Sequence, residues 1–413
     1  MTLSPAANPH AAAPSFWHRW RSVNDWLTRH EAFWRPVPFS EPVPAWCGDY
    51  PELAGWLEAL TDQECDDWNR HLEAFANEVS RFVPDLASYG ELVALPRLST
   101  PEAGRNAALA EVAAVDMPGR KRLQAGAFAA SVHALSGPVM DWCCGKGHLA
   151  RTLVGQGAGS VIGLEWNPEL VADGNRLAQR YGDPVQLRQQ DVMASHLGWP
   201  AAMHGVALHA CGDLHRQLLT SGSAAKASRL TFSPCCYHLM AKSHYWLLSE
   251  QARNAAGALA IDRPGLRLAV QETVTAPARE RRQASMISAW RLGFDALQRH
   301  VRNVDEYLPV PSHPTRLNSG DVEGFCVWAA QKKALPLPDQ VDWQRWQAEG
   351  QRRVRQVRRH ELLRHLFRRP LELWLVLDYA LYLEEQGYRV RLGTFCDRSL
   401  TPRNLLLDAV RAG

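Results

Sequence analysis

Two glycines that follow an acidic residue give the first indication of chemistry in this chain. In the stretch DWCCGKGHLARTL, residues 141–153, Gly145 and Gly147 follow Asp141 and lead into an amphipathic segment. Glycine lets a backbone turn tightly and approach a ligand without an intervening Cβ. The free amides at a helix start attract negative charge. The pattern is typical of a loop that holds a nucleotide-like ligand.

Acidic residues also close the next two apolar runs. Glu165 follows SVIGL, and Asp191 follows PVQLRQQ. A carboxylate after the second strand of such a unit is suited to ribose hydroxyls, and Asp191 is placed to accept an exocyclic amine such as that of adenine. A glycine loop alone is also explained by a tight strand-to-helix turn. The acids at two further strand ends make ligand binding the favoured interpretation.

Four polar side chains follow the fourth and fifth apolar runs, in LHACGDL (208–214) and SPCCYHLM (233–240). His238 is a candidate general base, because the unperturbed pKa of imidazole lies near working pH. Asp213 could orient an acceptor hydroxyl or amine, and His209 and Tyr237 are further hydrogen-bonding candidates. The alternative is that both histidines are partly buried structural residues.

The same strand ends carry potential metal ligands, namely Cys143, Cys144, Cys211, Cys235, Cys236 and His238. Adjacent cysteines do not match the C-x₂₋₄-C spacing with which two thiolates grip one zinc ion. Cysteine is also a common small buried residue. The sequence therefore predicts no metal site.

Composition is that of an ordinary globular protein. The 413 residues carry a formal net charge of +3, with 46% hydrophobic and 22% charged residues, as expected for a soluble chain with a large core. The start MTLSPAANPHAAAP lacks the features of a signal peptide, and the best candidate span, LELWLVLDYALYL, is too short to cross a bilayer. We expect a cytoplasmic protein with free thiols and no membrane contact, and nothing in the sequence specifies an oligomeric state.

The elements that must position these residues follow an alternating pattern. Five strand candidates lie between residues 138 and 236, namely PVMDW, SVIGLEW, PVQLRQQD, GVALHACGD and RLTFSPCC. HLARTLVGQG and PELVADGNRLAQRYG are amphipathic segments that close in glycine, as helices prefer. The alternation indicates right-handed βαβ units in a parallel sheet. VEGFCVWAAQ, residues 322–331, is one more strand candidate, and the chain end is typical of a helix and a hairpin that adds an antiparallel strand.

These motifs resemble those of class I S-adenosylmethionine-dependent methyltransferases. More narrowly, DWCCGKGHLARTL, ALHACGDLHRQLL and SPCCYHLM resemble the eukaryotic methyltransferase-like proteins labelled ribosomal-RNA adenine dimethylase domain-containing. They are also similar to the transfer-RNA 2′-O-methyltransferases that modify the acceptor stem. The C-terminal LDYALYLEEQGYRVRLGTFCDRSLTPRN resembles the tail of the first group. Cys143 stands where most class I enzymes have the first glycine of the loop.

The resemblance implies S-adenosyl-L-methionine as cofactor. It implies that the loop holds the cofactor's amino-acid end, that Glu165 binds its ribose and that Asp191 binds its adenine. The full set of implied cofactor contacts is Asp141, Cys143, Gly145, Gly147, Glu165, Asp191 and His209, and the implied catalytic set is His238, Asp213, Tyr237 and His209. Ser233, Pro234 and Tyr237 loosely match the motif that accepts a flipped base in amino-methyltransferases.

A basic segment and the resemblance together favour RNA as substrate. QRRVRQVRRHELLRHLFRRP, residues 351–370, carries eight arginines and one glutamate. Its apolar residues form a plausible buried stripe, so we expect the arginines from Arg352 to Arg369 to line exposed faces and track phosphates, with residues 120–122 as a second basic patch. The alternative is a solvated helix face whose arginines pair with acids. A protein or small-molecule acceptor, or a non-catalytic binding protein of the same fold, is the alternative function.

The expected fold class is α/β, a Rossmann-like methyltransferase sheet with an N-terminal helical domain and a helical insertion before the final β-hairpin. The expected ranges are a disordered tail at 1–14, a Trp-rich helical domain at 15–118, a cofactor-binding core at 119–240, a mainly helical insertion at 241–370, and a C-terminal helix and hairpin at 371–413.

Overall fold

Contacts divide the protein into two compact units. The computed structural model describes residues 15–132, 135, 137–194, 197–200, 202–271, 278–315, 317 and 320–412, and the tail expected at 1–14 lies outside them. Unit 1 combines residues 1–28, 92–272 and 369–413, and unit 2 combines residues 29–91 and 273–368.

These units cut across the ranges expected from the sequence. The first helix and residues 92–118 of the expected helical domain pack within unit 1. The expected insertion is divided as well, since residues 241–271 belong to unit 1 and 278–368 to unit 2. Periodicity along a sequence marks helices, but it does not say which helices pack together, so discontinuous units escape it.

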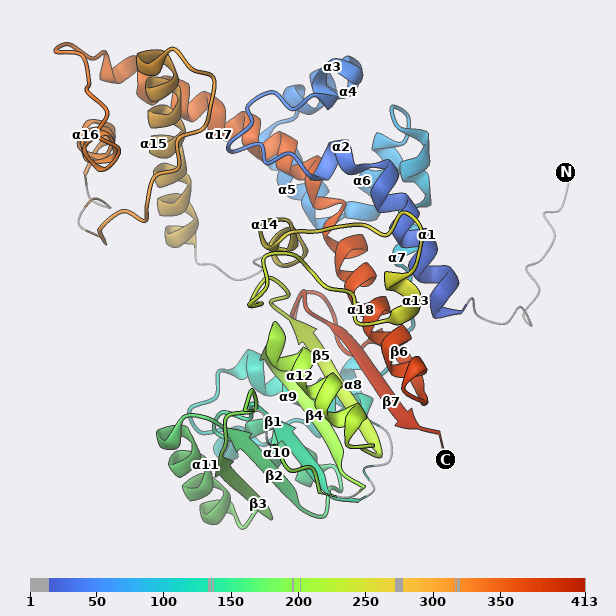
Figure 1. Cartoon of the computed structure of the whole chain (residues 1–413). Coiled ribbons are helices and arrows are strands. Elements are labelled where there is room, and N and C mark those ends of the chain that lie inside the picture. Colours follow the sequence, from blue (N-terminus) through green and yellow to red (C-terminus); the bar gives the residue numbers. More distant parts are fainter. Residues whose placement is uncertain are drawn as a thin grey trace, which may run out of the picture. The chain divides into compact units, whose positions relative to one another are not determined.

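Unit 1 contains a single mixed sheet of β1 (Val139–Trp142), β2 (Val161–Glu165), β3 (Val185–Gln189), β4 (His204–Cys211), β5 (Arg229–Cys235), β6 (Tyr388–Thr394) and β7 (Leu405–Arg411). The strand order is β3-β2-β1-β4-β5-β7-β6 (Figure 1). Strands β1 to β5 pair in parallel, and β7 runs antiparallel between β5 and β6. The α/β fold class with a Rossmann-like sheet completed by a C-terminal hairpin is therefore confirmed.

The strand order reverses between β1 and β4. The chain moves outward from β1 to β2 and β3, and then returns to the other side of β1 to form β4 and β5. In open α/β sheets, ligands bind outside the carboxyl ends of the strands at such a point. The residues after Trp142 and after Cys211 therefore flank the expected binding crevice.

Helices cover both faces of this sheet. On one face, α8, α9 and α10 share a buried apolar cluster with Val139, Val161 and Val206. On the other face, Gly205 of β4 meets a leucine of α12, and α12 packs against α18 through the 3.1 Å hydrogen bond between His215 Nε2 and the Tyr379 hydroxyl. Burial on both faces explains why the strands are continuous apolar runs.

The helices assigned mainly to unit 1 are α1 (Phe16–Arg29), α8 (Pro101–Ala107), η2 (Glu111–Ala113), α9 (Gly119–Ser131), α10 (His148–Gly155), α11 (Pro168–Tyr181), α12 (Asp213–Ala224), α13 (Glu250–Arg253), α14 (Arg263–Leu266), η3 (Leu268–Val270) and α18 (Arg368–Glu385).

The Trp-rich start of the chain belongs to unit 1 because α1 packs on α18. The indole of Trp20 stacks on that of Trp374 with a centroid distance of 6.1 Å. The Oδ1 of Asn24 accepts hydrogen bonds from Trp374 Nε1 at 3.1 Å and from the Leu259 amide at 2.9 Å. Aromatic packing, rather than base stacking, therefore occupies Trp20 and Trp374.

Among the described residues of unit 2, all regular elements are helices. Its helices are α2 (Glu31–Trp34), α3 (Trp46–Asp49), α4 (Pro51–Ala59), α5 (Asp62–Arg70), α6 (Leu72–Val79), η1 (Pro84–Ser88), α7 (Tyr89–Val93), α15 (Ala278–Arg302), α16 (Val322–Lys332) and α17 (Trp343–His365). Within the described parts of both units, no helix is long and apolar enough to cross a membrane.

Helix α16 corrects the strand expected at residues 322–331. Its most buried residues are Val322, Phe325, Cys326, Ala329 and Ala330, while Trp328 is 9% exposed. That spacing of three and four is the helical period. The carboxylate of Asp321 caps the helix by accepting the Gly324 amide at 2.8 Å. The β-branched and aromatic composition suggested a strand, but burial on one helical face decides the conformation.

The arginines of the basic segment are largely structural, so the expectation that they line exposed faces is wrong for half of them. Arg353, Arg359, Arg364 and Arg368 are buried. The Arg359 guanidinium donates to the carbonyls of Glu58 at 3.2 Å and of Leu60. The Arg364 Nε donates to the Trp34 carbonyl at 2.8 Å. Buried guanidinium groups require such partners, so these side chains join helices of unit 2.

The most enclosed of these ion pairs gives a test. Asp295 of α15 is 1% exposed and accepts hydrogen bonds from Arg353 at 3.1 Å and Arg299 at 3.0 Å. Asp295→Ala would leave two guanidinium groups without their buried counter-charge. We expect unit 2 to lose about 3 kcal/mol of unfolding free energy, measured by calorimetry that resolves the two units.

The matched control is Arg352→Ala, because Arg352 is 54% exposed and pairs with Glu349 in solvent. It should change the stability by no more than about 0.5 kcal/mol. Equal effects of the two substitutions would contradict a structural role for the buried arginines.

Candidate active site

The loop between β1 and α10 turns through three left-handed residues. Cys143, Gly145 and Gly147 have φ values of 57°, 56° and 70°. A Cβ on Gly147 would lie 3.0 Å from Leu187 Cδ1, whereas a Cβ on Gly145 would meet nothing within 4 Å. The left-handed backbone conformation therefore favours glycine at both positions. The open space beside Gly145 leaves room for ligand atoms.

Cys143 departs from the glycine of the resembling enzymes without changing the path of the loop. Its left-handed conformation is the one a glycine would adopt easily and a cysteine adopts at a cost of about 1 kcal/mol. The neighbouring Cys144 packs under the loop, because a Cβ on Gly163 of β2 would lie 2.6 Å from the Cys144 sulfur. The two adjacent cysteines thus have different surroundings.

Asp141 and Glu165 fix the two ends of this loop. The buried Oδ2 of Asp141 accepts the Ala150 amide at 3.1 Å, in the first turn of α10. Burial raises the pKa of Asp141 to about 7, and the charge of Glu165 adds to the increase while the Ala150 amide opposes it. Glu165 accepts the Gly145 amide and the Asn167 amide, each at 3.0 Å. A carboxylate has about four acceptor positions, so Glu165 keeps room for ligand hydroxyls.

The strand ends converge around Cys143. The pKa of the Cys143 thiol is raised to about 12, first by burial and then by the charges of Glu165, Asp141, Cys211 and Asp191. These groups come from the ends of four strands. Asp191 itself is exposed, and its Oδ1 accepts the Met193 amide at 2.9 Å. The structure thus brings together the residues expected to contact a cofactor at the ends of β1, β2 and β3.

Two exposed apolar side chains at these strand ends were missed by sequence reasoning. Trp166 follows Glu165 and is 73% exposed, and Met193 follows Asp191 by two residues and is 48% exposed. Large apolar side chains that are exposed to solvent beside polar groups often mark a ligand-binding site. The signal in the sequence was the position of each within two residues of a strand-end acid. Both could contact a planar base.

His209 lies near the end of β4, and His238 follows β5 by three residues. His209 is exposed at an irregularity of β4, where the register shifts between Leu208 and Cys211, and has a φ of 73°. Desolvation lowers its pKa, and the positive charge of Lys121 lowers it further. The Nδ1 of the half-buried His238 is itself buried and has no hydrogen-bond partner among the described residues.

Tyr237 and Asp213 have structural contacts instead. Tyr237 is 2% exposed, and its hydroxyl donates to Glu372 Oε1 at 3.3 Å. The Oδ2 of Asp213 accepts the Ala241 amide at 2.7 Å. Both residues hold the segment after β5 in place. Their expected catalytic roles remain predictions, and the observed contacts favour a role in positioning His238.

Gly212 explains the CGD motif at the end of β4. Its φ is 58°, and a Cβ there would lie 1.8 Å from the Leu239 carbonyl oxygen. The Asp213 amide donates to that same oxygen at 3.0 Å. Only glycine permits this approach. The start of α12 and the segment containing His238 are therefore fixed against each other.

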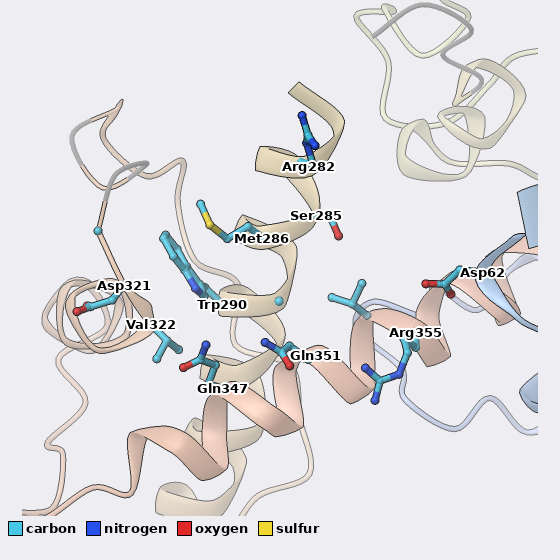
Figure 2. A pocket seen from close by; sticks show the side chains of 13 residues that line it. Asp62, Arg282, Ser285, Met286, Trp290, Asp321, Val322, Gln347, Gln351 and Arg355 are labelled. Atoms are coloured by element: carbon cyan, nitrogen blue, oxygen red, sulfur yellow. The ribbon is translucent and has the colours of Figure 1, made fainter. Parts of the chain in front are cut away.

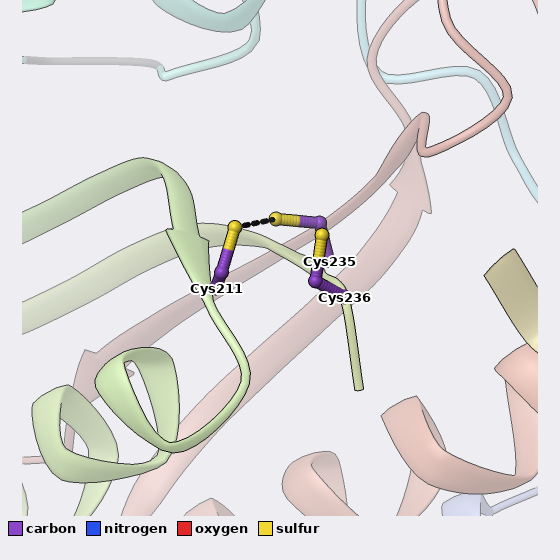
Figure 3. Close-up of side chains that lie close together, drawn as sticks. All are labelled: Cys211, Cys235 and Cys236. Atoms are coloured by element: carbon purple, nitrogen blue, oxygen red, sulfur yellow. Dashed lines mark hydrogen bonds between the residues drawn. The ribbon is translucent and has the colours of Figure 1, made fainter. Parts of the chain in front are cut away.

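Three of the six possible metal ligands converge. The sulfurs of Cys211, Cys235 and Cys236 all lie within 4.8 Å of one another (Figure 3), and those of Cys211 and Cys235 are 3.5 Å apart. Hydrogen bonding from Cys211 and Cys235 lowers the pKa of Cys236. Cys143, Cys144 and His238 do not join this group.

Unit 2 has a separate hollow of about 540 Å³ between α15, α16 and α17 (Figure 2). Met286 and Trp290 line it together with the polar side chains of Gln347, Gln351 and Arg355. None of the strand-end residues contributes to it. The hollow is therefore distinct from the crevice of the sheet.

Comparison with known proteins agrees with the arrangement in unit 1. Residues 127–243 match a family model described as a methyltransferase domain. The matched segment is a methyltransferase domain. S-adenosylmethionine is the methyl donor that such a domain implies, and the residues present are compatible with it, because there is open space beside Gly145 and the Trp166 side chain is exposed.

Other comparisons add little beyond the domain. One solved structure that the chain resembles is geranyl diphosphate methyltransferase in complex with GPP and sinefungin, at 19% identity and a TM-score of 0.24. The match covers 31% of this chain and 54% of that one, so the chain spans about half the length of the matched protein. No curated protein matches the chain.

Proposed function

We propose that the protein transfers the methyl group of S-adenosylmethionine to RNA, with the acceptor held beside the ends of β4 and β5. The observation that carries the proposal is a positive charge at this edge of the methyltransferase domain. The positive charge of Lys121 lowers the pKa of His209, and only desolvation lowers it more. The pKa of His148 is lowered to about 4, mainly by burial and by the charges of Arg151 and Lys146. Lys121 makes a smaller contribution in the same direction.

The donor half of the site would use the ends of three strands. Gly145 and the loop around it would hold the amino-acid end, Glu165 the ribose, and Trp166 with Asp191 the adenine. When bound, S-adenosylmethionine supplies a methyl carbon made electrophilic by its sulfonium. The main task of the protein is then to hold the acceptor in line with that carbon.

The acceptor half would use His209 as the base. A hydroxyl acceptor must lose a proton as it attacks, and a neutral imidazole can take it. Desolvation by the surrounding protein atoms and the charge of Lys121 both lower the pKa of His209, which favours the neutral ring. The half-buried ring of His238 offers a second group for orienting the acceptor.

Basic residues around the crevice support a polyanionic acceptor. Arg120 and Lys121 are exposed at the start of α9, and Arg403 lies close enough to Cys236 to act on its charge. Lysine and arginine contacts to phosphates provide most of the sequence-independent affinity for nucleic acids. This footprint lies on unit 1 and replaces the one expected on residues 352–369, where four of the eight arginines are buried.

The resemblance of the motifs to RNA-modifying subfamilies also supports RNA. The acceptor-stem transfer-RNA enzymes modify a ribose hydroxyl, and the ribosomal-RNA adenine dimethylase name implies a base nitrogen. A base at His209 favours the hydroxyl. A cytoplasmic location would suit the nine free cysteines of the chain, because that compartment keeps thiols reduced.

Label transfer tests the proposal. Purified protein is incubated with tritiated S-adenosylmethionine and extract from cells that lack the gene, and label is counted separately in RNA, protein and small-molecule fractions. We expect label in RNA. Gly147→Arg is the control, because a side chain at this left-handed position would collide with Leu187 and close the loop.

Label in protein or small molecules alone would contradict RNA as the acceptor and leave the methyltransferase activity standing. Label that persists in the Gly147→Arg reaction would show contamination. Absence of label from every fraction, with S-adenosylmethionine still bound, would contradict the proposed activity.

The pH dependence of RNA methylation tests His209 as the base. Protonation of His209 removes the base, so the rate at saturating RNA should fall on the acid side with a midpoint below 6.5, the ordinary pKa of histidine. Lys121→Gln removes a charge that lowers this pKa. The midpoint should therefore move upward in the variant, in rates measured from about pH 5 to 8.

Lys226→Gln is the matched control, because Lys226 is an exposed lysine beyond the far end of α12. Its midpoint should equal that of the unaltered protein. A midpoint that Lys121→Gln leaves in place would exclude His209 as the group that titrates.

A further inference from the structure

Three thiols from two neighbouring strands meet at the edge of the sheet where the acceptor is expected. Cys211 ends β4, Cys235 ends β5, and Cys236 follows directly (Figure 3). Their sulfurs lie within 4.8 Å of one another. Cys235 is buried, whereas Cys211 and Cys236 are half-buried, so the cluster can be reached from solvent.

The backbone is shaped to produce this convergence. Successive residues of a strand point to opposite faces, so Cys235 and Cys236 would diverge in an extended conformation. Cys236 instead has a φ of 48°, in the left-handed region. The register shift before Cys211 brings that residue opposite Cys235. Non-glycine residues hold left-handed conformations at a cost, and such strain gathers at functional sites.

The sulfur spacing matches that of a zinc site. Zinc binds thiolates at about 2.3 Å in tetrahedral geometry, which places two bound sulfurs about 3.8 Å apart. The observed separation of Cys211 and Cys235 is 3.5 Å, and the remaining pairs lie within 4.8 Å. Small rotations of the side chains would bring all three sulfurs to one ion.

We propose that Cys211, Cys235 and Cys236 bind one zinc ion through three thiolates, with the fourth coordination position open. Thiolates select zinc and other soft or borderline metals over magnesium and calcium. Iron–sulfur clusters are usually held by four cysteines, and the described residues bring together three. Three protein ligands with an exchangeable fourth position are the arrangement of catalytic zinc sites.

The charges around the three cysteines and their position beside the crevice are compatible with a bound zinc ion. Binding would release the protons of the three thiols and leave a complex of net charge −1 with water as the fourth ligand. Arg403 acts on the charge of Cys236 and would offset that negative charge. The charge of Cys211 reaches Cys143 in the donor loop, so the open position would lie beside the crevice.

The backbone at Cys236 removes the objection raised from the sequence. Adjacent cysteines lack the spacing of the common zinc motifs, but the left-handed turn redirects Cys236 toward its neighbour. The third thiol comes from a different strand. The metal site would exist whether or not the acceptor is RNA, because it rests on the three sulfurs alone.

Metal analysis of the full chain tests the proposal. Protein is purified with a phosphine reductant and without chelator, passed through gel filtration, and assayed for zinc, copper and iron. We expect about one zinc per chain. Cys211→Ala and Cys236→Ala should lose it, whereas Cys47→Ala, which removes another half-buried free cysteine from unit 2, should keep it.

Cobalt substitution provides a second measurement that needs no variant. Chelator-treated protein titrated anaerobically with Co²⁺ should develop a thiolate-to-metal charge-transfer band, and Cys47→Ala should reproduce it. The absence of both zinc and the cobalt band from the unaltered, folded protein would overturn the proposal. So would a different resident metal, zinc retained by both cluster variants, or a metal-free Cys211–Cys235 disulfide in the reduced preparation.

Discussion

The structure depends on left-handed turns at the carboxyl ends of its central strands. After β1 the chain turns at Cys143, Gly145 and Gly147, and after β4 and β5 it turns at Gly212 and Cys236, with His209 left-handed inside β4. Glycine adopts this conformation without cost, but each cysteine or histidine there costs about 1 kcal/mol. Three non-glycine residues at one edge of a sheet indicate that their side chains are needed, because glycine would give the same backbone at lower cost.

Two contacts convert these turns into a fixed crevice. The carboxylate of Glu165 accepts the Gly145 amide and so joins the donor loop to the end of β2. The Leu239 carbonyl accepts the Asp213 amide beside Gly212 and joins the segment after β5 to α12. Donor and acceptor groups are thus held by separate strands of one rigid sheet. That arrangement suits a reaction whose main requirement is the alignment of two bound molecules.

Much of this arrangement could be predicted from the sequence, because it rests on local patterns. The five central strands and both glycine-ended crossover helices are confirmed. Other features depend on tertiary contacts that no local pattern reveals. Helix α16 has strand-like composition but a helical burial face, Arg353 is basic but buried against Asp295, and the direction of the Cys236 side chain is decided by one backbone angle. The discontinuous units have the same origin, since their boundaries are set by which helices pack together.

The central claim is that these strand ends form the binding site of the methyl donor. Titration calorimetry of S-adenosylmethionine with the full chain tests it most directly. One molecule should bind per chain. Trp166→Ala should weaken binding about tenfold through loss of stacking on the base. Trp246→Ala, which removes another exposed tryptophan of unit 1, should leave the affinity unchanged. An unaltered protein that binds no S-adenosylmethionine, or equal weakening by both substitutions, would contradict the account.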